Sequence, residues 1–454
     1  MMVEGGPIVP QTAQAGPEVT NGTADRREDA IGPPPQRPTL VPAQRYVSPD
    51  FAQLEVERMW PKVWQVACSV DHVAEPGDYF EYRCGPYSVL IVRGDDGGLR
   101  AFQNVCRHRG NTLCTGSGSG ARELRCGYHG WTWNLAGDLK RVPNRKGFGT
   151  LHMAELPLIA VKVDTWERLV FVNLDTAAMP LSDYLEAVPH DIAWNRLGDF
   201  RCYATMTIEV DANWKTIADG FGETYHIQTL HPELHRCMDD VHAPQVIWGH
   251  TGKSEQLYGL QSPTIKEELS SSEVWDAYVS TQGALMGVAE GTPYPGGPGQ
   301  SVSDVIADRT KAFAAERGVD LSWASTEQMM RLHQYNVFPN MTLLTNAEHL
   351  TVMTSRPGRD PDHGELVMML WMRMPADSPR NTPADVRLMA DEAHPGLVLT
   401  QDITVLPGLQ RGLHQPGLTH LVLSNEERRV INMHRNLERY LDLPAAERMS
   451  GGDS

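Results

Sequence analysis

Short stretches of alternating or continuous apolar residues dominate the first third of the chain. Residues 79–83, 88–93 and 99–105 have this pattern, and Asp96-Gly97 between the last two is a dipeptide typical of hairpin turns. Closely spaced strands joined by tight turns favour antiparallel pairing. We therefore predict a small antiparallel β domain over residues 61–165.

After residue 166 the apolar pattern mixes strands with helices. The run at 169–174 is expected to open a second domain, and 343–354 and 365–374 are expected to be later strands separated by a loop rich in Pro, Gly and Asp. These segments predict a larger domain, residues 166–454, with an antiparallel sheet flanked by helices. The chain is therefore assigned to the α+β class.

Three helices are predicted from their caps and periodicity. Residues 48–60 begin with Ser48 as N-cap and Pro49 in the first turn. A second helix, 302–317, follows a Gly/Pro-rich segment that is a candidate cover for a binding site. The third begins with a capping box at 424–427, and its periodicity turns an apolar stripe inward, made of Val430, Met433, Leu437 and Leu441.

The first residues differ in composition from the rest. Residues 1–40 are rich in Gly, Pro, Thr and Ala with few apolar anchors, which predicts a disordered tail. Residues 41–60 would then form an N-terminal helical segment packed on the larger domain. A length of 454 residues suits two domains plus a tail, and no long repeat is visible.

Composition argues against several function classes. The net charge of −17 at pH 7 disfavours nucleic-acid binding, and no apolar run of about 18 residues is available to span a membrane. The start of the chain has neither a basic region nor an apolar core, so no secretory signal is expected. Five of the seven cysteines show no regular spacing, and we expect a reducing, cytoplasmic environment.

Two short motifs each pair a thiol with an imidazole. Cys106-Arg107-His108 is followed by Cys126-Gly127-Tyr128-His129. This order lets two loops clamp a two-iron cluster, with both Cys on one iron and both His on the other, which is the Rieske ligand set of an electron carrier. Gly110 and Gly130 allow backbone N–H groups to approach the sulfurs. A Cys2His2 zinc site is the alternative, but zinc fingers usually present both Cys before both His.

A second group of candidate ligands lies at 213–232. Read as a helix over 214–225, the segment places Asp219, Glu223 and His226 on one stripe. His231 would point about 140° away from His226 on a continuous helix. Pro232 disfavours helical geometry at His231, so we expect the helix to unwind there and bring the two imidazoles together. Two His and a carboxylate form the facial triad of non-haem Fe(II) oxygenases; two unrelated polar histidines are the plainer interpretation.

Together the two groups resemble the large (alpha) subunit of Rieske non-haem iron aromatic-ring-hydroxylating oxygenases. The matching family patterns are C-x-H-R-G…C-x-Y-H-G-W and N-W-K…[DE]-x-Y-H-x4-H, and the likeness runs from about residue 45 to the C-terminus. Shorter family-like stretches are 338–340, 356–358 and 410–413. The chain departs from the family at Asp219-Gly220-Phe221, where Glu-Asn-Phe is frequent, so no role is carried over for the usual Asn.

The resemblance implies a role for each matching side chain. Glu223 would be the acid that bridges an iron-ligating histidine to a Rieske histidine of a neighbouring subunit, and Asp219 is the second candidate for this role. The mononuclear iron would be held by His226 and His231. The [2Fe–2S] cluster would be held by Cys106, His108, Cys126 and His129.

The third iron ligand is expected far downstream. Asp402 lies in the apolar stretch 396–406, where a charge is destabilising unless it is paired or bound to a metal. Its position just before 408–412 also matches the family's third ligand. Asp391 and Glu392 are the fallback ligands, and an acid on a helix surface is the alternative interpretation of Asp402.

Two rival motifs fit less well. Glu223-Thr224-Tyr225-His226 is also the Glu-x-x-His motif of di-iron helical bundles, but the sequence shows no second copy. Asp391-Glu392-Ala393-His394 spells a helicase box, but the sequence shows no P-loop.

The resemblance implies a terminal oxygenase that uses O2 and relayed electrons to hydroxylate, once or twice, an aromatic or related apolar substrate. Electrons would come from NAD(P)H through a separate ferredoxin or flavin reductase, because the chain shows no G-x-G-x-x-G fingerprint. The family arrangement is a head-to-tail homotrimer, with or without a small beta subunit. An O- or N-demethylating monooxygenase and a pure Rieske electron-transfer protein are the alternatives.

Overall fold

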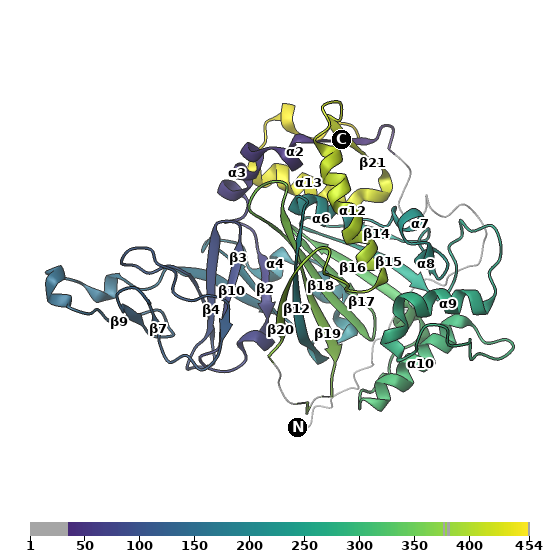
Figure 1. Cartoon of the computed structure of the whole chain (residues 1–454), viewed down its shortest axis with the longest axis horizontal. Helices are drawn as coiled ribbons and strands as arrows, with labels where there is room; N and C mark the ends of the chain where they lie inside the picture. The colour runs from purple at the N-terminus through teal and green to yellow at the C-terminus, as the bar shows by residue number, and fades with distance from the viewer. Residues whose placement is uncertain (1–34, 376, 379–381, 453–454) are drawn as a thin grey trace, which may run out of the picture.

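A small β-rich part and a larger mixed part lie side by side in the computed structural model, which describes residues 35–375, 377–378 and 382–452 (Figure 1). Most of the predicted tail, 1–40, lies outside the described residues. Its last positions are ordered, because β1 (Thr39–Pro42) pairs with β21 (His420–Leu423). The prediction of disorder is wrong for Thr39 and Leu40, because both pair with β21 and the Thr39 side chain is buried.

The small part is a seven-stranded antiparallel sheet with a three-stranded sheet at its outer end. The predicted strands and the Asp96-Gly97 turn are confirmed, and Gly97 has the positive φ of 78° that this turn requires. In spatial order the strands are β2 (Gln65–Ser69), β11 (Leu169–Asn173), β10 (Ala160–Trp166), β5 (Leu99–Gln103), β4 (Tyr87–Arg93), β3 (Tyr79–Cys84) and β6 (Ser117–Gly118). The outer sheet consists of β7 (Leu124–Arg125), β8 (Thr132–Trp133) and β9 (Leu139–Arg141).

The chain leaves the small sheet later than its pattern suggested. β10 and β11 form a tight hairpin in which Trp166 pairs with Leu169, so the predicted boundary between 165 and 166 falls inside it. The expectation that 169–174 opens the second domain is wrong. β11 is buried along its whole length because it lies between β10 and β2 in the first sheet.

The larger part is built on a nine-stranded sheet. In spatial order its strands are β13 (Met238–Asp239), β15 (Thr251–Tyr258), β16 (Arg331–Val337), β17 (Met341–Thr345), β18 (His349–Pro357), β19 (Gly364–Arg373), β12 (Phe200–Val210) and β20 (Ala384–Met389), and β14 (Gln245–Ile247) also pairs with β15. Neighbours are antiparallel except for the parallel pair β12–β20. The single strand predicted at 343–354 is a hairpin of β17 and β18, because the Asn346 side chain accepts backbone N–H bonds that close a turn.

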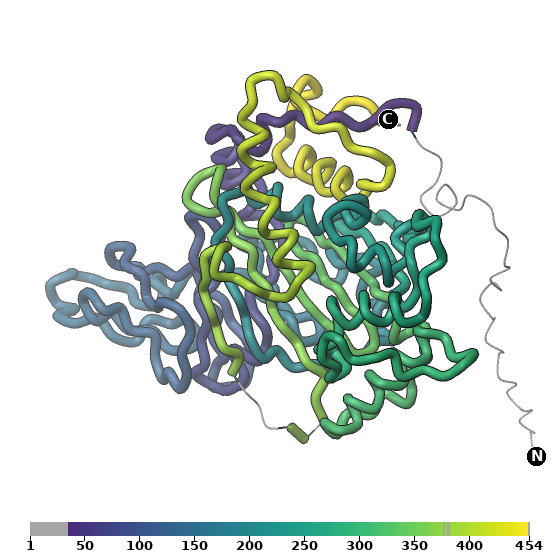
Figure 2. The backbone as a smooth tube through the Cα atoms, turned by 45° about the vertical axis from the view of Figure 1, so that its right-hand side comes forward, coloured from purple at the N-terminus to yellow at the C-terminus, as the bar shows by residue number. Residues whose placement is uncertain are grey.

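Helices cover the larger sheet on the side shown in Figures 1 and 2 and continue around its right-hand edge. The three predicted helices are confirmed, including the Ser48 cap and the Ser424 capping box. Those that bear on the site are α6 (Trp214–Gly220), α7 (Ile227–Leu230), α8 (Pro232–His235), α9 (Ser271–Gln282), α10 (Val302–Glu316), α11 (Thr326–Met330), α12 (Leu397–Leu413) and α13 (Arg428–Leu441). The shorter α2 (Gln44–Val47), α4 (Leu181–Tyr184) and α5 (Val188–Asp191) and the helix α3 (Pro49–Arg58) complete the described set.

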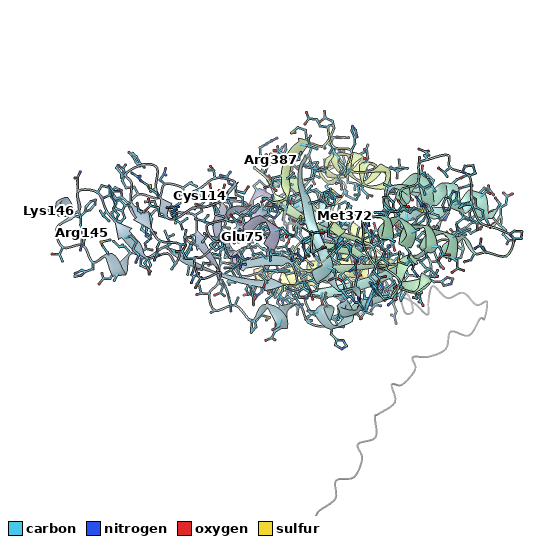
Figure 3. All side chains as sticks on the ribbon, turned by 90° about the horizontal axis from the view of Figure 1, so that it is seen from below. Glu75, Cys114, Arg145, Lys146, Met372 and Arg387 are labelled. Atoms are coloured by element: carbon cyan, nitrogen blue, oxygen red, sulfur yellow. The ribbon has the colours of Figure 1, made fainter. Side chains whose placement is uncertain are left out.

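Buried contacts tie the N-terminal helices to the larger part. Trp60 packs edge-on against Trp214, with ring centroids 5.0 Å apart. Glu55 of α3 pairs with Lys215 of α6 at 2.6 Å, and both side chains are almost fully buried. Seen from below, the small part projects away from this junction and carries Arg145 and Lys146 at its outer end (Figure 3). Within the described ranges, no helix combines the length and apolarity needed to cross a bilayer.

Candidate metal centres

The helix that leads to the second group of candidate ligands ends earlier than predicted. α6 begins at Trp214, capped by the Asn213 side chain, and ends at Gly220, whereas the prediction ran to residue 225. Gly222 in the turn that follows allows close packing on α13, because a Cβ there would meet Val430 at 2.8 Å. Glu223 and His226 therefore do not share a helical stripe with Asp219, and that part of the prediction is wrong.

The break predicted at His231 is confirmed. α7 ends at Leu230, His231 has φ −120° and ψ 67°, and Pro232 is the first residue of α8. This backbone bend turns the His231 side chain back toward His226, so that their ring centroids are 5.1 Å apart. Two histidines that would point apart on one helix thus face a common space.

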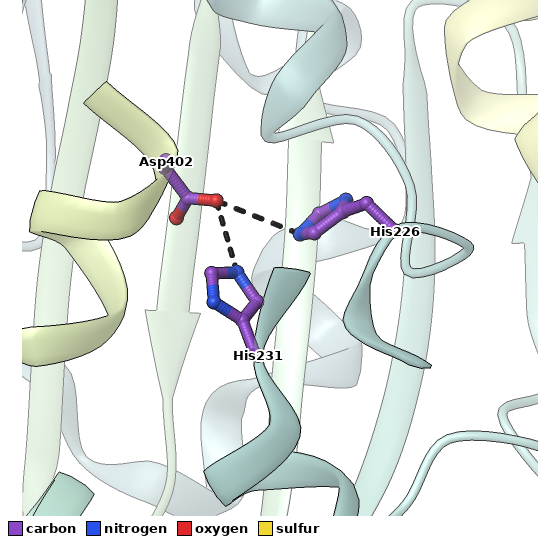
Figure 4. Close-up of side chains that lie close together, drawn as sticks. All are labelled: His226, His231 and Asp402. Carbon is purple, nitrogen blue, oxygen red and sulfur yellow. Dashed lines mark hydrogen bonds and ion pairs between the residues drawn. The ribbon is translucent and has the colours of Figure 1, made fainter. Parts of the chain in front are cut away.

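Asp402 of α12 completes this group from the opposite side (Figure 4). Its Oδ1 lies 2.9 Å from His231 Nε2 and 3.7 Å from His226 Nε2. One ligand atom from each residue lies within 4.8 Å of the others, so the three side chains could hold a metal ion. The fallback acids Asp391 and Glu392 are exposed and do not join it.

The remaining ring nitrogens are held by acceptors. His226 Nδ1 lies 2.6 Å from Glu223 Oε1, and His231 Nδ1 lies 2.7 Å from Gln401 Oε1. Since a carboxylate or amide oxygen only accepts, each Nδ1 carries the proton and each Nε2 presents a lone pair to the shared space. This arrangement suits metal binding by both imidazoles.

The charge of the site also suits a cation. Burial lowers the pKa of His226, but the hydrogen bond that His226 donates to Glu223 and the charges of Glu223 and Asp402 outweigh burial and raise the pKa above its ordinary value. An excess of negative charge that favours a proton on imidazole also favours a metal cation. The donor set and its charge therefore fit a mononuclear Fe(II) with two histidines and one carboxylate.

Asp219 is not part of this group. It accepts a hydrogen bond of 2.6 Å from the Tyr46 hydroxyl, and its other oxygen is buried without a hydrogen-bond partner in the described part of the chain. The tyrosine also lies 2.7 Å from His434 Nε2. The contacts of Asp219 are thus with α2 and α13, away from the triad.

The two thiol–imidazole motifs fold into matching loops in the small part. Gly110 N donates to Cys106 O at 3.0 Å, and Gly130 N donates to Cys126 O at 3.1 Å. Both glycines adopt positive φ, 76° and 70°, which closes each loop around its cysteine.

The donors converge as a cluster would require. The rings of His108 and His129 have centroids 4.7 Å apart, and His108 stacks on Trp131 at 5.1 Å. His108 Nδ1 is buried without a hydrogen-bond partner among the described residues, and an orphaned ring nitrogen of this kind is available to a metal. The two thiols also interact with each other.

Backbone N–H groups point at both sulfurs, as the two glycines suggested. Although burial opposes them, hydrogen bonds from the backbone of Tyr128 and His129 lower the pKa of Cys126. Burial dominates at Cys106 and raises its pKa, despite similar bonds from His108 and Arg109. Asn111 Nδ2 also approaches Cys126 Sγ at 3.7 Å. Two thiols supported by N–H donors and two imidazoles fit a [2Fe–2S] group.

The sequence prediction missed Gln401 and Asn111. Gln401 directly precedes Asp402 on α12 and orients His231, while Asn111 follows the first motif and reaches the sulfur of the second. Their positions next to candidate ligands were the available signal, because the contact of Gln401 joins residues 170 positions apart and the contact of Asn111 joins two separate loops.

A cavity of about 420 Å³ opens beside the triad. Its lining comes from α7, α9, the first turn of α12 and one face of the large sheet. The residues 287–300, predicted as a cover, do not line it. A space of this size is typical of small-molecule sites.

Two family descriptions match the chain. "Ring hydroxylating alpha subunit (catalytic domain)" matches residues 197–443, and "Rieske [2Fe-2S] domain" matches residues 63–162. The first match covers more than half of the chain and contains the triad, and the second contains both thiol–imidazole motifs.

Curated relatives with similar sequences include two kinds of oxygenase subunit. The chain is 29% identical over 239 residues to the "Carnitine monooxygenase oxygenase subunit" of Escherichia coli K12, a match that covers 51% of this chain and 64% of that protein. It is 33% identical over 190 residues to the "Benzene 1,2-dioxygenase subunit alpha" of Pseudomonas putida, covering 40% of this chain and 42% of the relative. The chain thus spans less than two thirds of these relatives' lengths.

Solved structures share the fold. A quaternary ammonium Rieske monooxygenase in complex with L-carnitine superposes with a TM-score of 0.65 at 19% identity, covering 91% of this chain and 98% of that one. Naphthalene 1,2-dioxygenase with bound indole also gives a TM-score of 0.65, at 18% identity, covering 90% and 94%. The arrangement of the two β-rich parts is therefore the one found in Rieske oxygenases.

Proposed function

This chain belongs to the family of ring-hydroxylating oxygenase alpha subunits, and from that membership we propose that it is the terminal oxygenase component of a multicomponent system. Such a component hydroxylates, once or twice, an aromatic or related apolar substrate with O2. The observation that carries the proposal is the presence in one chain of a two-thiol, two-imidazole clamp and a separate triad beside a cavity.

We assign Cys106, His108, Cys126 and His129 to a [2Fe–2S] cluster, and His226, His231 and Asp402 to a mononuclear Fe(II). When bound, the cluster supplies electrons one at a time, and the iron supplies open coordination positions for O2 beside the substrate. Glu223 and Gln401 hold the two imidazoles in the orientation in which Nε2 faces Asp402.

The domain assignment follows the separation of the cluster ligands in the small part from the triad in the larger part. We propose that the small sheet, with β11 included, is the cluster-binding domain, and that the remainder up to the C-terminal helix is the catalytic domain. A pure electron-transfer protein has no use for a triad of this kind with a cavity at its side, which disfavours that alternative. An O- or N-demethylating monooxygenase would use the same residues and is distinguished only by its product.

The proposed partners rest on two observations: the sequence shows no G-x-G-x-x-G dinucleotide fingerprint, and the two candidate centres lie in different parts of the molecule. We propose that electrons arrive from NAD(P)H through a separate ferredoxin, flavin reductase or both. We further propose a head-to-tail homotrimer, because a heterologous contact that closes into a ring can bring one subunit's cluster domain to its neighbour's triad.

A turnover screen tests the proposal. The iron-loaded protein, a surrogate ferredoxin and reductase and NADH are offered uncharged aromatics, aromatic acids and methyl ethers or amines, and O2 uptake and products are measured. We expect at least one compound to be hydroxylated or demethylated with incorporation of oxygen from O2. Cys126→Ser should abolish this turnover. A protein whose cluster is reduced normally but which oxidises no compound of any class would contradict the proposal.

A further inference from the structure

The cavity beside the triad has a polar strip on its sheet floor. Gln256 of β15 lies opposite Leu332 of β16, and Asn346 closes the β17–β18 hairpin with His349 across from it. All four side chains line the cavity. The next row of the floor has Leu344 and Leu370 on either side of Thr351, and its fourth member, Gln334, already donates through Nε2 to Phe221 O. The floor therefore combines apolar side chains with one strip of amides and an imidazole.

The described lining contains no lysine or arginine. Its carboxylates are Glu223 and Asp402, and both already face the histidines of the triad. Burial lowers the pKa of His349 to about 4, so this imidazole is neutral at neutral pH. A buried ionic group on a ligand is destabilised unless an opposite charge meets it. The lining offers no counter-charge for a carboxylate, and its acids are engaged at the triad.

The amide of Asn346 has a defined orientation. Its Oδ1 accepts the backbone N–H of Glu348 at 3.0 Å and of His349 at 2.8 Å, so Nδ2 must be the atom directed away from the turn. Nδ2 has no hydrogen-bond partner among the residues that the structure describes. Nearby, the Gln256 amide makes its hydrogen bond of 2.7 Å to Ser254 through one atom only. The strip thus retains a hydrogen-bond donor for a ligand.

We propose that the substrate is an uncharged, largely apolar molecule that carries a carbonyl or hydroxyl group, and that Asn346 determines specificity by donating a hydrogen bond to that oxygen. This inference rests on the proposed function, because it concerns the cavity of the same triad. The polar strip would anchor the oxygen-bearing end of the molecule, and the apolar remainder would extend along the cavity. Zwitterions and anions of the same size would be rejected.

Binding to the iron-loaded protein, measured by calorimetry without O2 or reductant, tests the inference apart from turnover. The probes share one bicyclic ring system: the hydrocarbon, its ketone, its carboxylate and its trimethylammonium derivative. We expect the ketone to bind at least about tenfold more tightly than the hydrocarbon, as one added hydrogen bond allows. The two ions should bind more weakly than either neutral probe. Equal or tighter binding of an ion would overturn the inference.

Asn346→Asp keeps the oxygen that closes the turn and replaces the donor by an acceptor. It should abolish the preference for the ketone over the hydrocarbon and improve binding of the trimethylammonium probe. Thr281→Val is the matched control, because the Thr281 hydroxyl lines the cavity but already donates to Ala277 O. It should retain the preference. Gln256→Leu, which leaves the turn untouched, should retain it as well if Asn346 is the donor.

The outcomes separate the two proposals. A ketone preference that Asn346→Asp removes, in a protein that turns over no compound, would support the recognition site while contradicting the oxygenase proposal. A ketone preference that survives Asn346→Asp in a protein whose melting temperature is normal would overturn the role of Asn346. Turnover of zwitterions alone would overturn the inference while supporting the oxygenase proposal.

Discussion

His226 and His231 each present one ring nitrogen to Asp402 because the other nitrogen is already held, by Glu223 and by Gln401. The chemistry of the site thus depends on pairs of residues, one that faces the metal position and one that orients it. Substituting a residue that faces the metal position should therefore have a different effect from substituting a residue that orients one of the histidines.

Asp402→Ala removes the one carboxylate that faces both histidines. We expect the variant to retain the visible and EPR spectra of the cluster but to lose the mononuclear iron and all turnover. Iron analysis should fall from about three to about two atoms per chain. If the variant keeps its third iron, the ligand assignment of Asp402 is wrong.

Glu223→Gln changes a charge while preserving size and one acceptor. Because Glu223 Oε1 holds His226 Nδ1 at 2.6 Å, and because we propose that the same carboxylate bridges to a neighbour's Rieske histidine, both metal positions should still fill. Single-turnover oxidation of the pre-reduced cluster, with substrate and O2 present, should slow by orders of magnitude. An unchanged rate would exclude the bridge, and Asp219 would not replace Glu223 because its contacts are with Tyr46 and His434.

His349 should contribute a pH dependence to stability. Its pKa is about 4 in the folded chain and about 6.5 when unfolded, so between these values the unfolded state binds a proton that the native state does not. Stability is therefore complete above pH 6.5 and falls as the pH drops toward 4, by up to ~3 kcal/mol. Denaturant unfolding at several pH values should show this loss in the wild type and a smaller one in His349→Gln. Parallel curves for the two proteins would argue against a neutral buried imidazole.

At the scale of elements, the position of each ligand depends on where a helix stops. α6 ends at Gly220 and α7 at Leu230, and the two breaks let Glu223, His226 and His231 face one space. The N-terminus of α6 is held by α3 through Glu55 and Lys215, so the helix that leads into the site is anchored at its far end.

Lys215→Met should loosen this anchor. It leaves the buried Glu55 carboxylate without its cation, a change that typically costs about 3 kcal/mol or more. The double variant Lys215→Met with Glu55→Gln should recover much of the loss, since the amide can still accept from Trp214 Nε1. Asp96→Asn, at the exposed pair with Arg100, is the control and should leave the free energy of unfolding nearly unchanged. Equal effects of Lys215→Met and Asp96→Asn would contradict the anchor.

At the scale of the whole molecule, the two candidate centres are far apart. The loops around β7 and β8 lie at the outer end of the small part, whereas α7 and α12 lie on the other side of the large sheet (Figures 1 and 2). Transfer within one chain would have to cross most of the molecule. Transfer between chains in a ring avoids this path, which is the physical basis of the proposed trimer.

Co-assembly of two inactive variants tests transfer between chains. Cys126→Ser lacks the cluster and Asp402→Ala lacks the mononuclear iron, so each alone should be inactive. When the two are co-expressed and purified together, an intact cluster can face an intact triad at some interfaces, and a sizeable fraction of wild-type turnover should return. Mixing the separately assembled variants without exchange of subunits is the control. Mixed assemblies that remain inactive would favour transfer within one chain.

The sequence by itself predicted the candidate ligand types, because thiols and imidazoles at short spacing are a local property of the sequence. Only a turn or a proline is needed to bring together the side chains between Cys106 and His129, or those of His226 and His231. The helices that begin at Pro49 and Val302 could be predicted for the same reason, because their caps are local sequence features. Asp402 stood out because a carboxylate in an apolar stretch needs a partner.

Only the tertiary structure decided the rest. α6 stops where Gly222 packs on Val430, a residue far along the chain, and β11 joins the first sheet because β2 and β10 flank it. The cavity lining is assembled from strands and helices distant in sequence, so its lack of counter-charges and the free donor of Asn346 could not be predicted. The side chains that could bind a metal are recognised from their sequence neighbours, whereas the shape and charge of a cavity depend on how distant elements pack.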